Sequence, residues 1–147
     1  MFFVFAMALI ALVSYRLITS RRVAAPVEAE IPDHIPWRTD LSGALDESKK
    51  TGKPVLVDFS ASWCPPCRQM RRDTWPDPRV GEQVRTGYIP VLIDADSADS
   101  SGPANRYGIQ VMPTLLVLDS NGSLLRQANY LSADEMLNFL TQSPHPG

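Results

Sequence analysis

The most constraining feature of the sequence is the stretch Val55–Cys67, in which an apolar run leads directly into a Cys-Pro-Pro-Cys motif. The run is rich in β-branched and aromatic residues and is broken by one charge, Asp58, which is typical of a buried strand. Pro65 and Pro66 fit the first turn of a helix, because the N–H groups that prolines lack would be unpaired there. The stretch therefore predicts a strand that enters a helix through a Cys-x-x-Cys turn.

Two cysteines with this spacing at a helix start suit disulfide exchange. The attacking sulfur must be a thiolate, and the positive end of the helix dipole stabilises that anion. We expect Cys64 to be the more exposed and to act as the nucleophile. Cys67, one helical turn further in, would then resolve the mixed disulfide. Trp63 is expected to cover one side of the site.

Three segments carry a family resemblance. Residues 57–67, Val-Asp-Phe-x-Ala-x-Trp-Cys-x-x-Cys, resemble the active-site signature of the thioredoxin superfamily. Residues 71–80, Arg-Arg-Asp-Thr-Trp-Pro-Asp-Pro-Arg-Val, resemble the segment after the active site in the reductase domains of membrane thiol:disulfide interchange proteins. Residues 111–122, Val-Met-Pro-Thr-Leu-Leu-Val-Leu-Asp-Ser-Asn-Gly, resemble the cis-proline loop, strand and hairpin of that family. The likeness runs from Trp37 to Leu140.

The alternation of helical and strand patterns, with a hairpin near the end, agrees with this resemblance. It predicts a thioredoxin-like α/β fold, with a mixed central β-sheet and helices on both faces. The expected strands are 55–59, 88–94, 115–118 and 124–130. The expected helices are 37–51, 78–86, 100–107, 133–141 and one that starts at Pro65. Asp40 or Ser42 can cap the first of these helices. Ser132 and Glu135 form a capping-box pattern before the last helix.

Asp58 has two interpretations. It could point to a polar edge as a solvated aspartate, or it could lie beneath the cysteines with a raised pKa and carry the proton to or from Cys67. The resemblance favours the second role, because the matching aspartate of thioredoxins has it. In many thioredoxins a lysine on the next central strand approaches that aspartate, but Tyr88–Asp94 contains no lysine.

The resemblance also implies that the Met112–Pro113 peptide bond is cis and faces the cysteines. A cis X-Pro bond turns the backbone so that neighbouring groups can pair with a bound peptide. An ordinary trans proline before a strand is the alternative that base rates favour. The residues expected to contact substrate are Trp63, Pro65, Pro66, Met112, Pro113 and Thr114. Trp75 could pack under its loop or be exposed near the site, and a single tryptophan favours packing.

The N-terminal segment is apolar from Phe2 to Val13. We expect residues 1–20 to be a membrane anchor, with a cleaved signal peptide as the alternative, because no basic residue precedes the apolar run. Residues 21–36 have a linker composition, 37–142 form the domain and 143–147 a flexible tail. Arg16, Arg21 and Arg22 favour a cytoplasmic domain. Membrane-tethered relatives work outside the cytoplasm, and this resemblance favours the periplasmic side.

Composition excludes several classes of function. The formal net charge is −2, with no strongly basic patch, so nucleic-acid binding is not expected. Two cysteines and two distant histidines make a poor zinc site. Asp94 and Asp96 lack the pattern of a calcium loop and read as a polar turn. No metal or organic cofactor is required.

The sequence therefore predicts a thiol–disulfide oxidoreductase that reduces protein disulfides through Cys64 and Cys67, with Asp58 handling the proton. A separate dithiol donor, such as a membrane reductase, would supply the electrons. An oxidase or isomerase that uses the same residues is the first alternative, because the sequence does not give the effect of the Pro-Pro dipeptide on the potential. A non-catalytic adaptor with a structural disulfide is the second.

Overall fold

The computed structural model describes residues 35–142. The predicted anchor (1–20), the predicted linker up to residue 34 and the predicted tail (143–147) lie outside the described residues. Within residues 35–142, no helix has the length and apolar character needed to cross a membrane. Ile35 is buried in the core, so the packing of the domain already includes this residue of the predicted linker.

Four strands form one mixed sheet in the order β2-β1-β3-β4. The strands are β1 (Val55–Ser60), β2 (Ile89–Asp94), β3 (Thr114–Leu118) and β4 (Leu124–Ala128). β1 pairs with β2 in parallel and with β3 antiparallel, and β3 pairs with β4 antiparallel. The predicted mixed sheet is confirmed. The strand that leads to the cysteines is interior, and β4 is an edge strand as expected.

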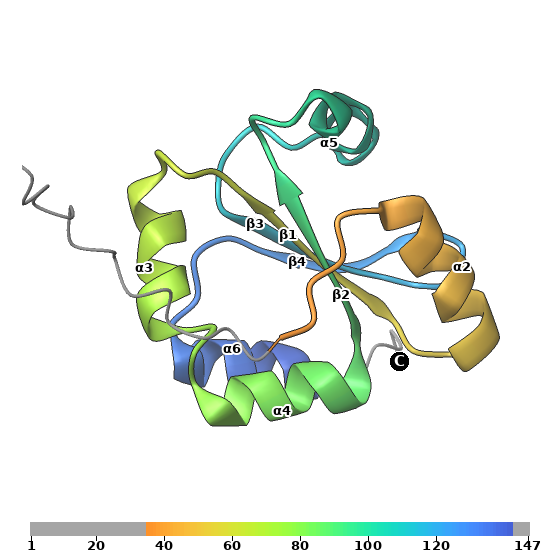
Figure 1. The fold of residues 1–147 in the computed structure, drawn as a ribbon. Helices are drawn as coiled ribbons and strands as arrows, with labels where there is room; N and C mark the ends of the chain where they lie inside the picture. The colour runs from red at the N-terminus through yellow and green to blue at the C-terminus, as the bar shows by residue number, and fades with distance from the viewer. Residues whose placement is uncertain (1–34, 143–147) are drawn as a thin grey trace, which may run out of the picture. The chain divides into compact units, whose positions relative to one another are not determined.

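Helices cover both faces of this sheet (Figure 1). One face packs against α2 (Leu41–Thr51) and α5 (Ser101–Tyr107), which a short 3-10 turn (Ala98–Ser100) precedes. The other face packs against α3 (Pro65–Asp73), α4 (Pro78–Gly87) and α6 (Ala133–Thr141). The predicted arrangement of helices on both faces is confirmed.

Burial on both faces explains the nearly continuous apolar run of β1, whose six residues are all buried. Leu56 packs into the cluster with Met70, Val80 and Met136, on the side of α3, α4 and α6. Val57 packs into the opposite cluster, on the side of α2 and α5. Because side chains alternate along a strand, Asp58 shares the face of Leu56.

The first helix begins later than predicted. The sequence predicts a helix from Trp37, but α2 starts at Leu41, and Asp40 caps it by accepting hydrogen bonds from two backbone N–H groups. The chain before it is extended, because Arg38 makes a parallel bridge to Val91 at the outer edge of β2. The N–H of Arg38 donates to the carbonyl of Pro90 over 3.0 Å. Pairing with the sheet therefore overrides the helical pattern at these residues.

The other predicted caps are confirmed. Ser132 and Glu135 form the capping box at the start of α6. Gly108 ends α5 with φ 63°, a left-handed conformation that favours glycine. Gly122 has φ 78° in the turn between β3 and β4, where the sequence predicts a hairpin.

Candidate active site

The cysteine motif lies at the junction that the sequence predicts. β1 ends at Ser60, and Cys64 is the N-cap of α3, with Pro65 and Pro66 in the first two helical positions. The Sγ atom of Cys64 accepts a hydrogen bond from the backbone N–H of Cys67 over 3.4 Å. Since the two prolines have no N–H, that group is the first backbone donor of the helix.

Cys64 and Cys67 form a disulfide, with their Cα atoms 5.3 Å apart. Both are buried: Cys64 is 3% exposed and Cys67 is 1% exposed. Cys64 is the more exposed of the two, as predicted, but its exposed fraction is smaller than expected for a nucleophile at the surface. The reason is that Ala95 and Met112 pack against the pair.

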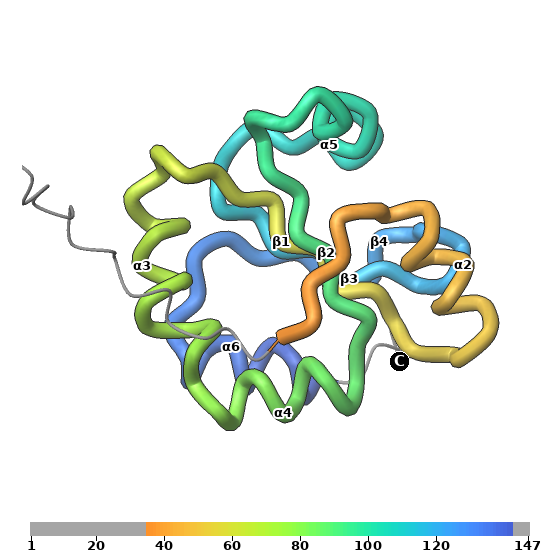
Figure 2. The backbone as a smooth tube through the Cα atoms, in the orientation of Figure 1, coloured from red at the N-terminus to blue at the C-terminus, as the bar shows by residue number. Residues whose placement is uncertain are grey.

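The loop before β3 faces this disulfide. The Met112–Pro113 peptide bond is cis, which confirms the expectation. The carbonyl oxygen of Met112 lies 3.5 Å from the Sγ atom of Cys64. Figure 2 traces the two segments that meet here, the one that leaves β1 for α3 and the one that returns from α5 to β3. Residues 48 positions apart are thus brought into contact at the cysteines.

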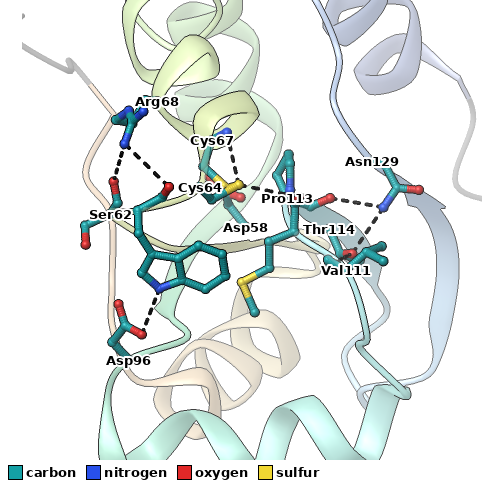
Figure 3. The surroundings of a disulfide bond; sticks show 12 residues. Asp58, Ser62, Cys64, Cys67, Arg68, Asp96, Val111, Pro113, Thr114 and Asn129 are labelled. Atoms are coloured by element: carbon teal, nitrogen blue, oxygen red, sulfur yellow. Dashed lines mark hydrogen bonds between the residues drawn. A yellow bond between two sulfur atoms is a disulfide. The ribbon is translucent and has the colours of Figure 1, made fainter.

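A side chain that the sequence analysis missed anchors this loop (Figure 3). Asn129 donates from Nδ2 to the carbonyl of Pro113 over 3.0 Å and to the hydroxyl of Thr114 over 3.3 Å. The hydroxyl of Thr114 donates to the carbonyl of Val111 over 2.7 Å. Asn129 follows an edge strand in a stretch without a motif, so nothing in the sequence singled it out.

Trp63 directly precedes Cys64 in the chain and is 61% exposed. Its indole Nε1–H donates to Oδ1 of Asp96 over 3.0 Å. The sequence predicts a polar turn at Asp96, and the hydrogen bond of Asp96 with Trp63 was not predicted. The guanidinium of Arg68 lies 3.4 Å from the carbonyl oxygen of Trp63 and holds the same turn from the helix side.

Asp58 is 3% exposed and lies in the middle of β1, so it is not a solvated edge residue. Its neighbours in the sheet register are Leu92 on β2 and Leu115 on β3. The indole Nε1–H of Trp75 donates to Oδ2 of Asp58 over 3.2 Å. Trp75 is 3% exposed, which confirms its predicted packing, but its hydrogen bond to Asp58 was not predicted.

Comparison with known proteins gives the family. Residues 41–144 match the thioredoxin-like domain. The chain belongs to this thioredoxin-like family. It is 30% identical over 124 residues to the thiol:disulfide interchange protein DsbD of Salmonella paratyphi A, a match that covers 80% of this chain and 21% of that protein. DsbD of Haemophilus ducreyi is 28% identical over 95 residues, 62% of this chain and 17% of that protein. The chain thus spans about a fifth of the length of these relatives.

Solved structures agree with this assignment. The oxidised C-terminal domain of Neisseria meningitidis DsbD superposes with a TM-score of 0.61 at 28% identity, covering 72% of this chain and 97% of that domain. A thioredoxin from Thermus thermophilus superposes with a TM-score of 0.66 at 23% identity, covering 74% of this chain and 86% of that one. The second likeness supports the fold alone.

The thioredoxin-like domain and its cysteine pair support thiol–disulfide exchange as the chemistry of this site. A disulfide between Cys64 and Cys67 at a helix N-terminus can open and close by exchange with a partner dithiol or disulfide. The exchange itself needs only sulfur atoms and proton carriers. The resemblance inferred from residues 57–67, 71–80 and 111–122 is therefore confirmed.

Proposed function

We propose that this chain reduces disulfides in protein substrates and receives its electrons from a separate dithiol donor, such as a membrane reductase. The observation that carries the proposal is the Cys64–Cys67 disulfide at the start of α3 in a thioredoxin-like domain. The similarity to thiol:disulfide interchange proteins supports it. Asp58 and the loop around Pro113 would both serve this exchange.

The reaction starts from the dithiol form. The thiolate of Cys64 attacks one sulfur of the substrate disulfide, that S–S bond breaks, and the departing substrate thiolate takes a proton. Cys67 then loses its proton and attacks the sulfur of Cys64, which releases the second substrate thiolate. The substrate gains two electrons and two protons in total, and the enzyme leaves as a disulfide. A donor dithiol restores the enzyme by the same steps in reverse.

The helix start would stabilise the thiolate of Cys64. A sulfur anion there lies at the positive end of α3 and accepts the N–H of Cys67, which lies 3.4 Å from it in the disulfide form. Pro65 and Pro66 withhold two further N–H donors from the same turn. The dipeptide between the cysteines would therefore tune the reduction potential.

Asp58 would act as the proton carrier for Cys67. It is a buried carboxyl on the strand that leads to the motif, and in Figure 3 it lies behind the disulfide. Burial disfavours the charged form of a carboxyl, which brings its proton affinity closer to that of a thiol. A group with such an affinity can accept the proton as Cys67 becomes nucleophilic.

The substrate would lie along the loop that faces Cys64. Met112 packs against the cysteines, and the carbonyl oxygen of Met112 lies near the sulfur that would be attacked. Backbone groups on either side of Pro113, with the adjoining Thr114, would hold an extended substrate segment. Trp63 would contact the substrate from the opposite side, since most of its ring is exposed.

We also propose that residues 1–20 anchor the chain in the membrane, that 21–36 form a linker, that 37–142 form the catalytic domain on the extracytoplasmic side, and that 143–147 form a flexible tail. The apolar run from Phe2 to Val13 supports the anchor, and the similarity to thiol:disulfide interchange proteins supports the catalytic domain. Retention of the full chain in the membrane pellet after carbonate washing would support the anchor. A mature protein that begins after residue 20 would support the cleaved signal peptide instead.

The reductase proposal is tested by trapping. The full chain with Cys67→Ser should form a covalent adduct with insulin through Cys64, because the resolving thiol is missing. The dithiothreitol-driven reduction of insulin should be fast with the unchanged protein and lost in Cys64→Ser. If neither the adduct nor the acceleration is observed, the proposal is wrong and the adaptor is favoured. Faster oxidation of a reduced protein substrate than reduction of insulin would favour the oxidase.

A further inference from the structure

Trp75 follows α3 and turns back into the core. The backbone N–H of Trp75 donates to the carbonyl of Met70, five residues earlier, over 2.9 Å as the chain leaves α3. Just before it, the hydroxyl of Thr74 donates to the carbonyl of Leu131 over 2.8 Å. The ring of Trp37 packs edge-on against that of Trp75, with the ring centres 4.9 Å apart. Backbone and ring contacts therefore fix where the indole of Trp75 points.

The indole of Trp75 reaches the middle of β1. Its Nε1–H donates to Oδ2 of Asp58 over 3.2 Å, and both side chains are 3% exposed. An indole N–H can only donate, so it can bond to an ionised carboxylate but cannot take a proton from it. A hydrogen bond to the charged form favours that form and opposes the effect of burial. The geometry therefore makes Trp75 a hydrogen-bond donor that suits the carboxylate form of Asp58.

The same helix carries the resolving cysteine and leads to this donor. Cys67 lies in the first turn of α3, and Trp75 lies two residues beyond its last residue, Asp73. Asp58 lies on the strand beneath, whose neighbouring positions in the sheet are occupied by leucines. A change in how α3 sits on β1 would thus move the thiol and the hydrogen-bond donor together.

We propose that Trp75 is a positioning residue for thiol–disulfide exchange, which acts on the cysteine pair through Asp58 by holding its carboxylate ionised and in place. This inference rests on the proposed role of Asp58 as proton carrier. Trp75 supplies an indole N–H to the buried carboxyl of Asp58, whereas β2, the strand that carries a lysine in many thioredoxins, contains none here. Trp75 touches no reacting atom, so its effect must appear as a change in how Asp58 titrates.

Other titratable or charged groups lie on the same side of the sheet within residues 35–142. They are Cys64 and Cys67 at the start of α3, Tyr88 before β2, Arg126 on β4 and Tyr130 after β4. Arg126 donates to the hydroxyl of Tyr88 over 2.9 Å. Arg126 stands in register with Val117 and thereby with Leu56, two residues before Asp58. The charged groups of α4 and α6 lie on their exposed sides.

The test is Trp75→Phe in the full chain, with the Asp58 carboxyl followed by carbon-13 NMR across a pH titration. Phenylalanine keeps an aromatic ring in the core but removes the N–H. We expect the midpoint of Asp58 to rise by about one to two pH units, the shift expected when a hydrogen bond to a charged group is lost. Asp58→Asn identifies the signal, and Trp37→Phe removes the other indole of the pair and should leave the midpoint near its original value.

A second measurement is the rate of substrate release from the mixed disulfide as a function of pH. In Trp75→Phe the acid limb of this rate should move to higher pH with the Asp58 midpoint, and in Asp58→Asn, with or without Trp75→Phe, that limb should be absent. If Trp75→Phe unfolds the chain, benzothienylalanine at position 75 keeps the shape of tryptophan without its N–H.

The outcomes separate the two proposals. An unchanged Asp58 midpoint, or an equal shift in Trp37→Phe, overturns the inference about Trp75 while exchange continues. A shifted midpoint with an unchanged rate profile means that Asp58 is not the proton carrier, and the inference falls with that role. If the unchanged chain reduces no disulfide at all, the reductase proposal itself is wrong, whatever the titration gives.

Discussion

Asn129, just after the edge strand, donates a hydrogen bond from Nδ2 to the carbonyl oxygen of Pro113 over 3.0 Å. The same amide reaches the hydroxyl of Thr114, which in turn donates to the carbonyl of Val111. The side chain of Asn129 therefore holds Pro113 and Thr114 directly, and Val111 through Thr114, in the loop that faces Cys64. We infer that the position of this loop, and with it the substrate site, depends on Asn129.

Asn129→Ala should weaken substrate binding more than it slows chemistry. Loss of a hydrogen bond that contributes about 1 kcal/mol would raise KM for a protein disulfide about fivefold. The variant Gln127→Ala changes an exposed residue of β4, two positions before Asn129, and serves as the matched control. Steady-state reduction of insulin measures both, and equal KM values in the two variants would contradict the inference.

Asp96 should position Trp63. Asp96→Ala removes the acceptor of the indole N–H, so the Trp63 indole signal in the nitrogen-15 NMR spectrum should move toward that of a water-exposed indole. Substrate affinity should fall a few-fold, which corresponds to the loss of about one hydrogen bond. Asp96→Asn keeps an acceptor and should retain most of the affinity. Asp99→Ala removes a nearby exposed charge and should leave the indole signal in place.

Replacement of Asp58 should separate stability from activity. Asp58→Asn keeps an acceptor for Trp75 but removes a charge whose desolvation is unfavourable in the core. The free energy of unfolding of the disulfide form should therefore rise by about 1 kcal/mol or more at neutral pH. Release of substrate should become slower, because the proton carrier is gone. Thermal unfolding and stopped-flow kinetics measure the two effects. A less stable variant with unchanged kinetics would argue that Asp58 is a structural residue.

Asp77, the N-cap of α4, gives a pH-dependent contribution to stability. Its pKa is lowered from 3.8, chiefly by the side-chain hydrogen bond from Arg79, whose Nη2 lies 2.8 Å from Oδ2 of Asp77. Because the folded pKa lies below the unfolded one, the stabilisation is fully present above 3.8 and is lost as pH falls through the folded value.

Asp77→Ala should therefore cost about 1 kcal/mol at neutral pH, the typical value of an N-cap, and progressively less in acid. Asp77→Asn keeps the capping oxygen and removes the charge, so it should lose only the pH-dependent part. Urea unfolding at several pH values measures both variants. A destabilisation that stays constant down to strongly acidic pH would contradict the assignment to the ionised carboxylate.

The sequence was sufficient for features that depend on neighbouring residues. The strand that enters a helix at Cys64, the capping box at Ser132 and the turn at Gly122 are local patterns with a direct physical cause. The resemblance added the cis bond at Pro113, which no local pattern requires. The start of α2 was misplaced because Arg38 joins the sheet through a strand far along the chain.

The contacts that the sequence did not predict join residues that no periodicity relates. Trp75 and Asp58 are 17 positions apart, and Trp63 and Asp96 are 33 positions apart. Each pair links a position on β1 or just after it to an irregular segment whose path depends on the packed fold. A buried carboxyl indicates that a donor is needed, but only the structure identifies Trp75 as one.

The reduction potential of the Cys64–Cys67 pair in the full chain tests the central claim most directly. It would be measured by equilibration with dithiothreitol and glutathione buffers, with Cys64→Ser as the control that cannot form the disulfide. A reductase that receives electrons from a dithiol donor should have a potential near or below about −250 mV. A potential well above about −180 mV would contradict this account and assign the chain to disulfide formation or isomerisation.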